Sequence, residues 1–106
     1  MKKIFCGSFE VQGNTLDKLD GAAGGFVYCF SADKDMYTAT QNMMNALIED
    51  EYEIMEVEYI KIVNEEFLEE LEEKDRKDFY TLGEKAIKNN DVVYSDFYTY
   101  EVTHLI

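Results

Sequence analysis

The sequence predicts a single α+β domain: one mixed β-sheet of about four strands, in the order β-β-α-β-α-β, with two main helices packed on one face. Segments with the apolar/polar alternation of β-strands are interleaved with segments whose apolar residues recur every three or four positions, as on a helix. The 106 residues have the length of one domain, so residues 1–106 are assigned to a single unit. Hydrophobic residues make up 46% of the chain, which is enough for a core and argues against general disorder.

The first two strands are expected at residues 3–12 and 26–30. The first (KIFCGSFEVQ) begins with apolar residues on both sides, which indicates a strand that is covered on both faces at one end. The second (FVYCF) is apolar on both sides and is therefore predicted to be central. Residues 13–25 contain four of the six glycines and are interpreted as a loop, with one helical turn near residues 15–19.

The first helix is expected from about Lys34 to Glu49. Ser31 or Asp33 is predicted to cap it, because a short polar side chain accepts hydrogen bonds from the first free backbone N–H groups. Its apolar stripe is formed by Met36, Thr40, Met43, Met44 and Leu47. The methionines are interpreted as core residues.

A long strand is predicted at residues 52–63, with Met55, Val57 and Tyr59 on one face and Glu56 and Glu58 on the other. Two helical segments should follow it. Asn64 is expected to cap the first, which starts at Glu65 and Glu66, and Asp75 to cap the second, which ends near Asn89 and Asn90.

The last strand is predicted at residues 91–102 (DVVYSDFYTYEV), which is rich in β-branched and aromatic residues. Tyr94, Tyr98 and Tyr100 are expected to alternate on one face, with Asp96 between them. Tyrosine is enriched in binding hot spots, so this row is a candidate for contact with a partner. The alternative is that the tyrosines pack beneath a helix.

Charge is the most unusual property of the chain, which has 23 acidic and 10 basic residues and a net charge of −13. Such a chain repels nucleic-acid phosphates and anionic membrane surfaces, so neither is an expected partner. It attracts basic protein surfaces and accelerates their association. A high negative charge also serves solubility alone, which is the alternative explanation.

The acidic residues are concentrated between Glu49 and Asp78, a stretch that contains fourteen acidic and four basic residues. If the elements of this stretch are neighbours, their side chains form one negative face, which favours a basic partner over a merely solvated surface. The predicted partner-binding residues are Glu53, Glu56, Glu58, Glu65, Glu66, Glu69, Glu70, Glu73, Tyr94, Asp96, Tyr98 and Tyr100.

No enzymatic activity is predicted. The single histidine, His104, lies near the C-terminus, and a Cys–His or Ser–His pair would need it anchored beside Cys6, Cys29 or a serine. A thiol-dependent enzyme that uses Cys29 or Cys6 is the alternative. Asp33-Lys34-Asp35 begins like a calcium loop but lacks the glycine and the closing glutamate, and no Cys/His cluster suggests zinc. We therefore expect neither a metal nor a cofactor.

The cytoplasm is the predicted compartment. The two cysteines lie in predicted strands and are expected to be free thiols, too few for the disulfide framework of a small secreted domain. The Met-Lys-Lys start is not followed by the apolar run of a signal peptide, and no apolar run is long enough to span a bilayer.

Four features resemble small bacterial immunity proteins of polymorphic or contact-dependent growth-inhibition toxin systems. They are FVYCFSAD at 26–33, the helix containing Ala39 and Leu47, the acidic ED–YEI–EVE pattern at 49–58 and VVYSDFYTYE at 92–101. The resemblance implies a compact acidic α+β domain that binds and blocks a toxin, often a basic nuclease. A phage-encoded nuclease inhibitor of the anti-CRISPR type, or a small regulatory ligand-binding domain, remains an alternative.

Overall fold

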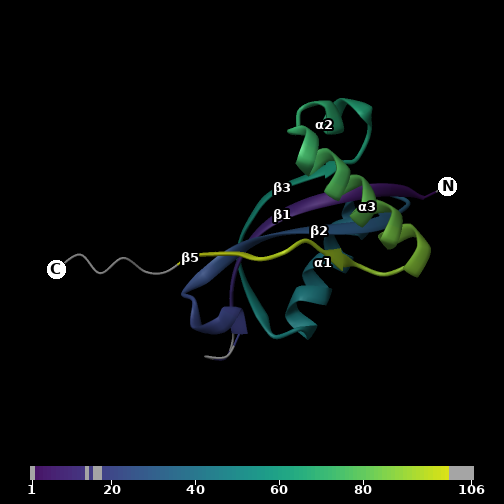
Figure 1. Ribbon diagram of the computed structural model, residues 1–106. Helices are drawn as coiled ribbons and strands as arrows, with labels where there is room; N and C mark the ends of the chain where they lie inside the picture. Colours follow the sequence, from purple (N-terminus) through teal and green to yellow (C-terminus); the bar gives the residue numbers. More distant parts are fainter. Residues whose placement is uncertain (1, 14, 16–17, 101–106) are drawn as a thin grey trace.

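The computed structural model describes residues 2–13, 15 and 18–100, and it confirms the predicted α+β class (Figure 1). Its elements are β1 (Lys3–Gly13), the 3-10 helix η1 (Lys18–Gly21), β2 (Gly24–Asp33), α1 (Met36–Glu49), β3 (Tyr52–Ile62), α2 (Glu65–Glu69), α3 (Glu73–Asn89), β4 (Val93–Tyr94) and β5 (Tyr98–Tyr100). Residues 101–102 of the predicted last strand, part of the predicted turn at 15–19, and His104 lie outside the described residues.

The strands form one sheet in the order β3-β1-β2-β4, and β5 also pairs with β2. Every pairing is antiparallel, whereas the sequence analysis expected a mixed sheet. The difference has a topological cause. β2 and β3, which α1 connects, run in the same direction, but β1 lies between them and is antiparallel to both.

The helices cover both faces of the sheet, and the expectation that they share one face is wrong. One core cluster joins α1 to Phe9, Val27 and Cys29, while the other joins α2 and α3 to Cys6 and Phe30. Central strands that are apolar on both sides must be covered on both sides. We call these two sides the α1 side and the α3 side.

The α1 side is packed tightly around Met43 and Leu47, which are fully buried together with Ala39. Gly7 permits this close approach, since a Cβ atom built there would lie 2.7 Å from the Met43 sulfur. Met36, at the other end of the predicted stripe, remains 45% exposed. The predicted stripe is therefore correct for the middle and end of α1 and wrong for its first residue.

The N-cap of α1 is Asp35 and not Ser31 or Asp33. The Asp35 carboxylate accepts a hydrogen bond from the Thr38 backbone N–H at 2.7 Å. Asp33 is buried instead, where its carboxylate accepts hydrogen bonds from the Ser31 hydroxyl and, at 2.9 Å, from the Asn42 amide. β2 extends through Asp33, so the helix begins later than expected.

Asn64 caps α2 as predicted, with its side-chain oxygen accepting from the Phe67 N–H at 2.8 Å. The next helix already begins at Glu73, so Asp75 lies in its first turn and is not its cap. That helix ends at Asn89, and its C-cap Asn90, whose backbone is left-handed (φ 51°), supplies the predicted stop.

Candidate protein-binding face

The last strand is interrupted, and this interruption changes the side on which its tyrosines lie. Cys29 pairs with Tyr94, and Phe26 pairs with Tyr98. The two residues of β2 are three positions apart, whereas the two tyrosines that pair with them are four positions apart. One extra residue reverses the alternation of side chains. The expectation that Tyr94, Tyr98 and Tyr100 share one face is therefore wrong.

Ser95 stabilises the interruption through both its backbone and its side chain. Its N–H donates to the Tyr28 carbonyl at 2.8 Å, and its hydroxyl accepts from the Tyr28 N–H at 2.9 Å. The hydroxyl thus replaces the backbone acceptor that the irregular strand no longer offers. No residue pattern in the sequence indicates that the Ser95 hydroxyl accepts this hydrogen bond.

Tyr94 lies on the α1 side and is half-buried there. Its hydroxyl donates to the Asp50 carboxylate at 2.7 Å, and its ring lies edge-on to Phe97, which stacks on Tyr52 at 4.8 Å. Burial, followed by the hydrogen bond to Asp50, raises the pKa of the Tyr94 phenol. Tyr94 is thus separated by the sheet from the other two tyrosines of the predicted row.

β3 also departs from strict alternation, at two β-bulges opposite β1. Ser8 pairs with Tyr59, and its hydroxyl donates to the Glu58 carboxylate at 2.6 Å. Glu58 and Tyr59 therefore both lie on the α3 side, whereas the sequence analysis placed them on opposite faces. A bulge sets two residues of one strand against one residue of its partner, which alternation alone does not predict.

The bulges gather three predicted carboxylates on the α3 side. Glu53 pairs with Gln12, whose amide donates to it at 2.7 Å, and Glu56 pairs with Glu10. Directly paired residues of an antiparallel sheet point to the same face, so Glu53, Glu56, Glu58 and Glu10 lie together. Glu10 was not predicted, because its role depends on the pairing of β1 with β3.

Aromatic side chains from β2 and β5 complete this surface. Tyr98 is 55% exposed and its ring lies edge-on to Tyr28, with centroids 6.2 Å apart. Tyr100 packs 5.6 Å from Phe26, and its hydroxyl donates to the Glu10 carboxylate. We call the set the tyrosine face: Phe26, Tyr28, Tyr98, Tyr100, Glu10, Glu53, Glu56 and Glu58.

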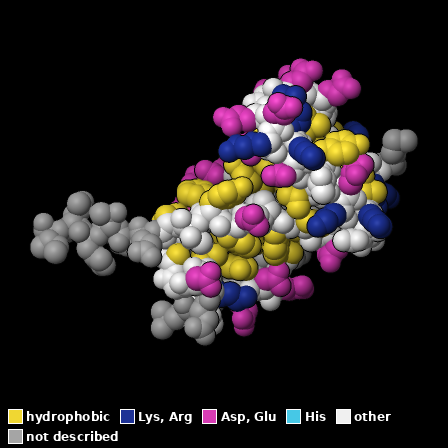
Figure 2. Space-filling model, viewed as in Figure 1, with side chains coloured by type: hydrophobic (Ala, Val, Ile, Leu, Met, Phe, Trp, Pro, Cys, Tyr) yellow, Lys and Arg dark blue, Asp and Glu magenta, His cyan; other side chains and the backbone are white. Residues whose placement is uncertain are grey.

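Figure 2 is viewed from the α3 side and shows hydrophobic side chains open to solvent beside the helices, with acidic side chains around them. A groove of about 400 Å³ between α3 and β5 borders this region. Its lining includes the predicted residues Asp96 and Tyr98 and two acids of α3 that were not predicted, Asp75 and Asp78, together with Lys77 and Lys85. The groove is consequently less one-sided in charge than the tyrosine face.

The remaining predicted acids belong to another part of the surface. Glu65, Glu66, Glu69, Glu70 and Glu73 are all exposed on α2 and at the start of α3. These helices follow the end of β3, about 20 Å along the strand from Glu56 at roughly 3.3 Å per residue. The acidic stretch is thus divided between the first half of β3 and the helices that follow it, and it does not form one continuous face.

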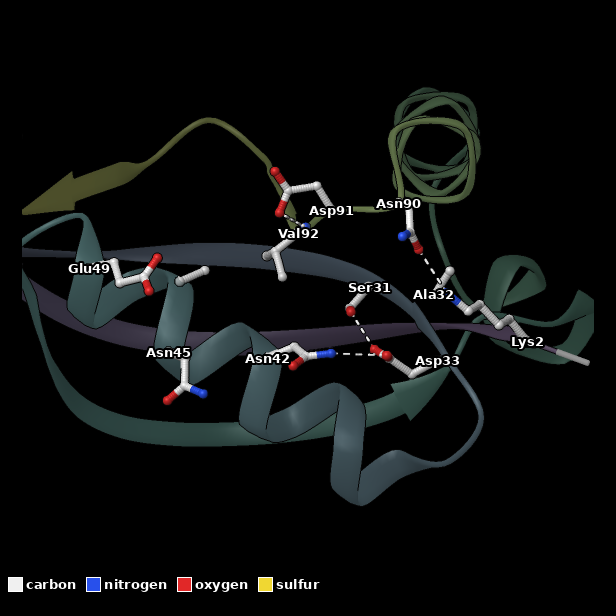
Figure 3. Close-up of a pocket in the computed structure, with 11 residues that line it drawn as sticks. Lys2, Ser31, Ala32, Asp33, Asn42, Asn45, Glu49, Asn90, Asp91 and Val92 are labelled. Atoms are coloured by element: carbon white, nitrogen blue, oxygen red, sulfur yellow. Dashed lines mark hydrogen bonds between the residues drawn. The ribbon is translucent and has the colours of Figure 1, made fainter.

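A second hollow, of about 470 Å³, lies on the α1 side (Figure 3). It is lined mainly by polar side chains of α1, β2 and the segment before β4. At its floor lies the buried Asp33 carboxylate, and at its rim the Lys2 ammonium donates to the Asn90 amide oxygen at 2.7 Å. We call it the polar groove.

Both cysteines are free and buried, as predicted. Cys6 pairs with Phe30 and Cys29 pairs with Gly7, so the thiols belong to neighbouring pairs and point to opposite faces of the sheet. This arrangement separates them by the thickness of the backbone layer. Their strands do pair, but the thiols do not meet.

Because both thiols are buried, they should not react with thiol reagents in the folded protein. Their burial should also make the stability of the protein sensitive to alkaline pH. Burial raises the pKa of Cys6 from 9.0 to about 12. The pKa of Cys29 is also raised, mainly by burial and to a lesser extent by the nearby Cys6. As the pH rises above the unfolded-state pKa, the unfolded chain loses thiol protons that the folded chain keeps. The free energy of unfolding should therefore be highest below pH 9.0 and decline through about pH 12. Urea titrations over this range test this.

The cysteine contribution is isolated by Cys6→Ala and Cys29→Ala variants, whose stability should decline less steeply in alkali than that of the wild type. A thiol reagent at neutral pH should label the wild type only when urea unfolds it. Rapid labelling of the folded protein would contradict the buried placement of both cysteines.

Within the part of the chain that the structure describes, no group of three or more His, Cys, Asp or Glu side chains is arranged to hold a metal ion. Nor does any helix among these residues have the length and apolar composition needed to cross a membrane. No protein-family model, curated protein or solved structure matches this chain.

Proposed function

We propose that this protein is an acidic inhibitor that works by binding a basic protein and blocking its active surface, and not by catalysis. The partner that best fits the resemblance of the sequence is a bacterial toxin, for which the chain would be the cytoplasmic immunity protein. One observation carries the proposal. Tyr98 is 55% exposed on a sheet face that also presents the carboxylates of Glu53, Glu56 and Glu58.

This combination suits a basic partner for two reasons. Tyrosine contributes a large apolar area with a polar tip at a low cost in side-chain entropy, so an exposed tyrosine anchor stabilises a complex at its centre. The surrounding carboxylates complement lysine and arginine, and they accelerate encounter through their long-range field. A nuclease active site that normally binds phosphates would present such basic side chains.

The test begins with capture of partners from the native host on immobilised protein, at low salt. The wild type should retain a basic protein that the triple variant Glu53→Lys, Glu56→Lys, Glu58→Lys loses. With the captured protein purified, the association rate should fall as salt rises, because the Debye length shortens from about 10 Å at 0.1 M. Co-expression with the wild type should relieve any toxicity of the partner.

The matched control reverses three exposed acids elsewhere, Glu49, Glu84 and Asp91, with the same change in net charge. It should slow association much less than reversal of the β3 glutamates. An association rate that ignores both salt and the β3 reversals would mean that the acids serve only solubility, and the proposal would fail. A captured phage or CRISPR nuclease would place the same face in the anti-CRISPR class of inhibitor.

The polar groove supports a second candidate function, binding of a small polar ligand. Its size and its lining of amide, hydroxyl and carboxylate groups suit a molecule with several hydrogen-bonding groups. Mass spectrometry of the native protein after gentle purification should then detect a bound metabolite. An Asn42→Leu variant, which replaces an amide of the groove lining with an apolar side chain, should lose it.

A further inference from the structure

β3 is a long free edge of the sheet. It ends the strand order β3-β1-β2-β4 and contains eleven residues, whereas β4 and β5 at the other edge have two and three. Among the described strands it pairs with β1 alone. A long exposed edge is a template for another strand, and proteins commonly shield such edges unless they use them.

The unpaired backbone groups of β3 can be assigned from the register. The Val63 N–H donates to the Ile4 carbonyl at 2.8 Å, so in the alternating antiparallel pattern Lys61 and Tyr59 also bond to β1. Ile60 and Ile62, which lie between these positions, therefore direct their N–H and C=O groups away from β1. These groups are the ones that an added strand would bond.

The two sides of this edge differ in chemistry. The α3 side presents Glu53, Glu56 and Glu58, as described above, and one basic residue, Lys61, which pairs with Cys6. The α1 side presents apolar residues paired with the inward-facing residues of β1: Ile54, Val57, Ile60 and Ile62. A strand laid along β3 would therefore meet carboxylates on one side and apolar side chains on the other.

A hollow of about 360 Å³ adjoins the second half of the edge. Its apolar lining includes Ile60, Ile62, Phe67 and Met36, which is 45% exposed. Its polar lining is Asn64, Lys61, Glu66 of α2 and Glu70, the C-cap of α2. The hollow has room for an apolar side chain, and its two carboxylates outnumber its one ammonium, so its net charge favours a basic side chain over an acidic one. Two of the predicted acids, Glu66 and Glu70, thus lie beside the second half of this edge, whereas Glu53, Glu56 and Glu58 lie on its first half.

We propose that β3 accepts an extended basic segment of the partner as an additional edge strand. Alternate side chains of this segment would be basic, opposite the β3 glutamates, and apolar, on the α1 side with one in the hollow beside Met36. Backbone hydrogen bonds would give affinity and the alternating side chains specificity. The inference rests on the proposed function, whose basic partner supplies the segment.

Charge selects this occupant over a second copy of the chain. Pairing β3 with β3 would bring the Glu53, Glu56 and Glu58 carboxylates of two copies onto one sheet with only one lysine on each strand, and an excess of like charge across a strand pair destabilises a sheet. The one basic residue of β3, Lys61, lies over the Tyr59 ring with its nitrogen 4.9 Å from the centroid. The edge therefore disfavours self-association and favours a basic strand.

The probe is a capped peptide of about nine residues with alternating lysine and valine, the length of a typical strand. Hydrogen exchange of the full chain is followed by NMR with and without it. Exchange of the Ile60 and Ile62 amides should slow by about tenfold or more. The amides of Tyr59 and Lys61, already bonded to β1, should change little. The same peptide with glutamate in place of lysine should give no protection.

The triple variant Glu53→Lys, Glu56→Lys, Glu58→Lys should reverse the peptide preference. The glutamate peptide should then protect the Ile60 and Ile62 amides, and the lysine peptide should not. If the lysine peptide shifts the Tyr98 ring resonances without protecting these amides, strand addition is overturned while the tyrosine face stands as a docking site. If the lysine peptide changes neither the Tyr98 resonances nor the amide protection, strand addition is also overturned, and the captured partner still tests the proposed function separately. Equal protection by both peptides would refute selection by charge.

Discussion

Replacing Phe79 with alanine should lower the free energy of unfolding by about 3–5 kcal/mol, as expected for a large buried aromatic side chain. Phe79 is 5% exposed and links α3 to three other aromatic rings. Its centroid lies 4.9 Å from Tyr28, 5.2 Å from Phe30 and 6.1 Å from Phe67. The substitution would remove both the buried apolar area and three ring contacts, and a small domain has only about 5–15 kcal/mol to lose.

The matched control is the adjacent residue of the same helix. Tyr80 is 57% exposed, and Tyr80→Ala should change the free energy of unfolding by no more than about 0.5 kcal/mol. Urea denaturation followed by far-UV circular dichroism measures both variants. Equal effects of the two substitutions would mean that α3 is not held on the sheet through Phe79.

The Phe79 cluster also connects the core to the tyrosine face. Tyr28 contacts Phe79 on one side and Tyr98 on the other. Loss of the Phe79 ring should therefore loosen the support of Tyr98 and weaken partner binding even where the fold persists. The α3 helix thus contributes to the proposed site by positioning its aromatic residues, and not only by covering the sheet.

The helices could be predicted from the sequence because their signals are local. Met43 and Leu47 mark the buried side of α1, Asn64 accepts from an N–H three residues later, and Asn90 adopts the left-handed conformation that ends a helix. Each signal depends on residues within a few positions of one another. The same holds for the strand segments themselves, whose composition is sufficient to identify them.

The register of the strands could not be predicted, because it depends on pairing between distant segments. A single extra residue near Ser95 puts Tyr94 and Tyr98 on opposite sides of the sheet. The bulges of β3 in turn bring Glu53 and Glu58 to one side, although alternation would separate them. The candidate site therefore has the residue types that the sequence indicated, in an arrangement that only the pairing defines.

The apolar patterns of β1 and β2 already require helices on both faces of the sheet, although helices on one face were predicted. β1 begins with apolar residues on both sides, and β2 is apolar throughout its middle, so each face of the sheet needed a cover. Two helical regions were available, and one went to each face. The resulting α3 side is covered at one end only, which leaves Tyr98 open to solvent.

Tyr98→Ala should weaken the complex with the basic partner by about 2 kcal/mol or more, which corresponds to an increase of about thirtyfold in the dissociation rate. Tyr98 is the most exposed aromatic residue of the tyrosine face, shares that face of the sheet with the β3 carboxylates and borders the groove that Asp96 lines. A hot spot anchor acts on dissociation, because its contacts form only after docking. Surface plasmon resonance with the captured partner measures both rates.

Tyr37 provides the matched control, since it is 74% exposed on α1, on the other side of the sheet. Tyr37→Ala should leave both rates unchanged, and neither substitution should lower the free energy of unfolding by more than about 1 kcal/mol, because both rings are largely exposed. The β3 reversals should act mainly on association, through long-range attraction, so the two kinds of variant should separate in the kinetics. If Tyr98→Ala and Tyr37→Ala gave the same dissociation rate, the tyrosine face would not be the contact surface, and the partner would have to bind elsewhere.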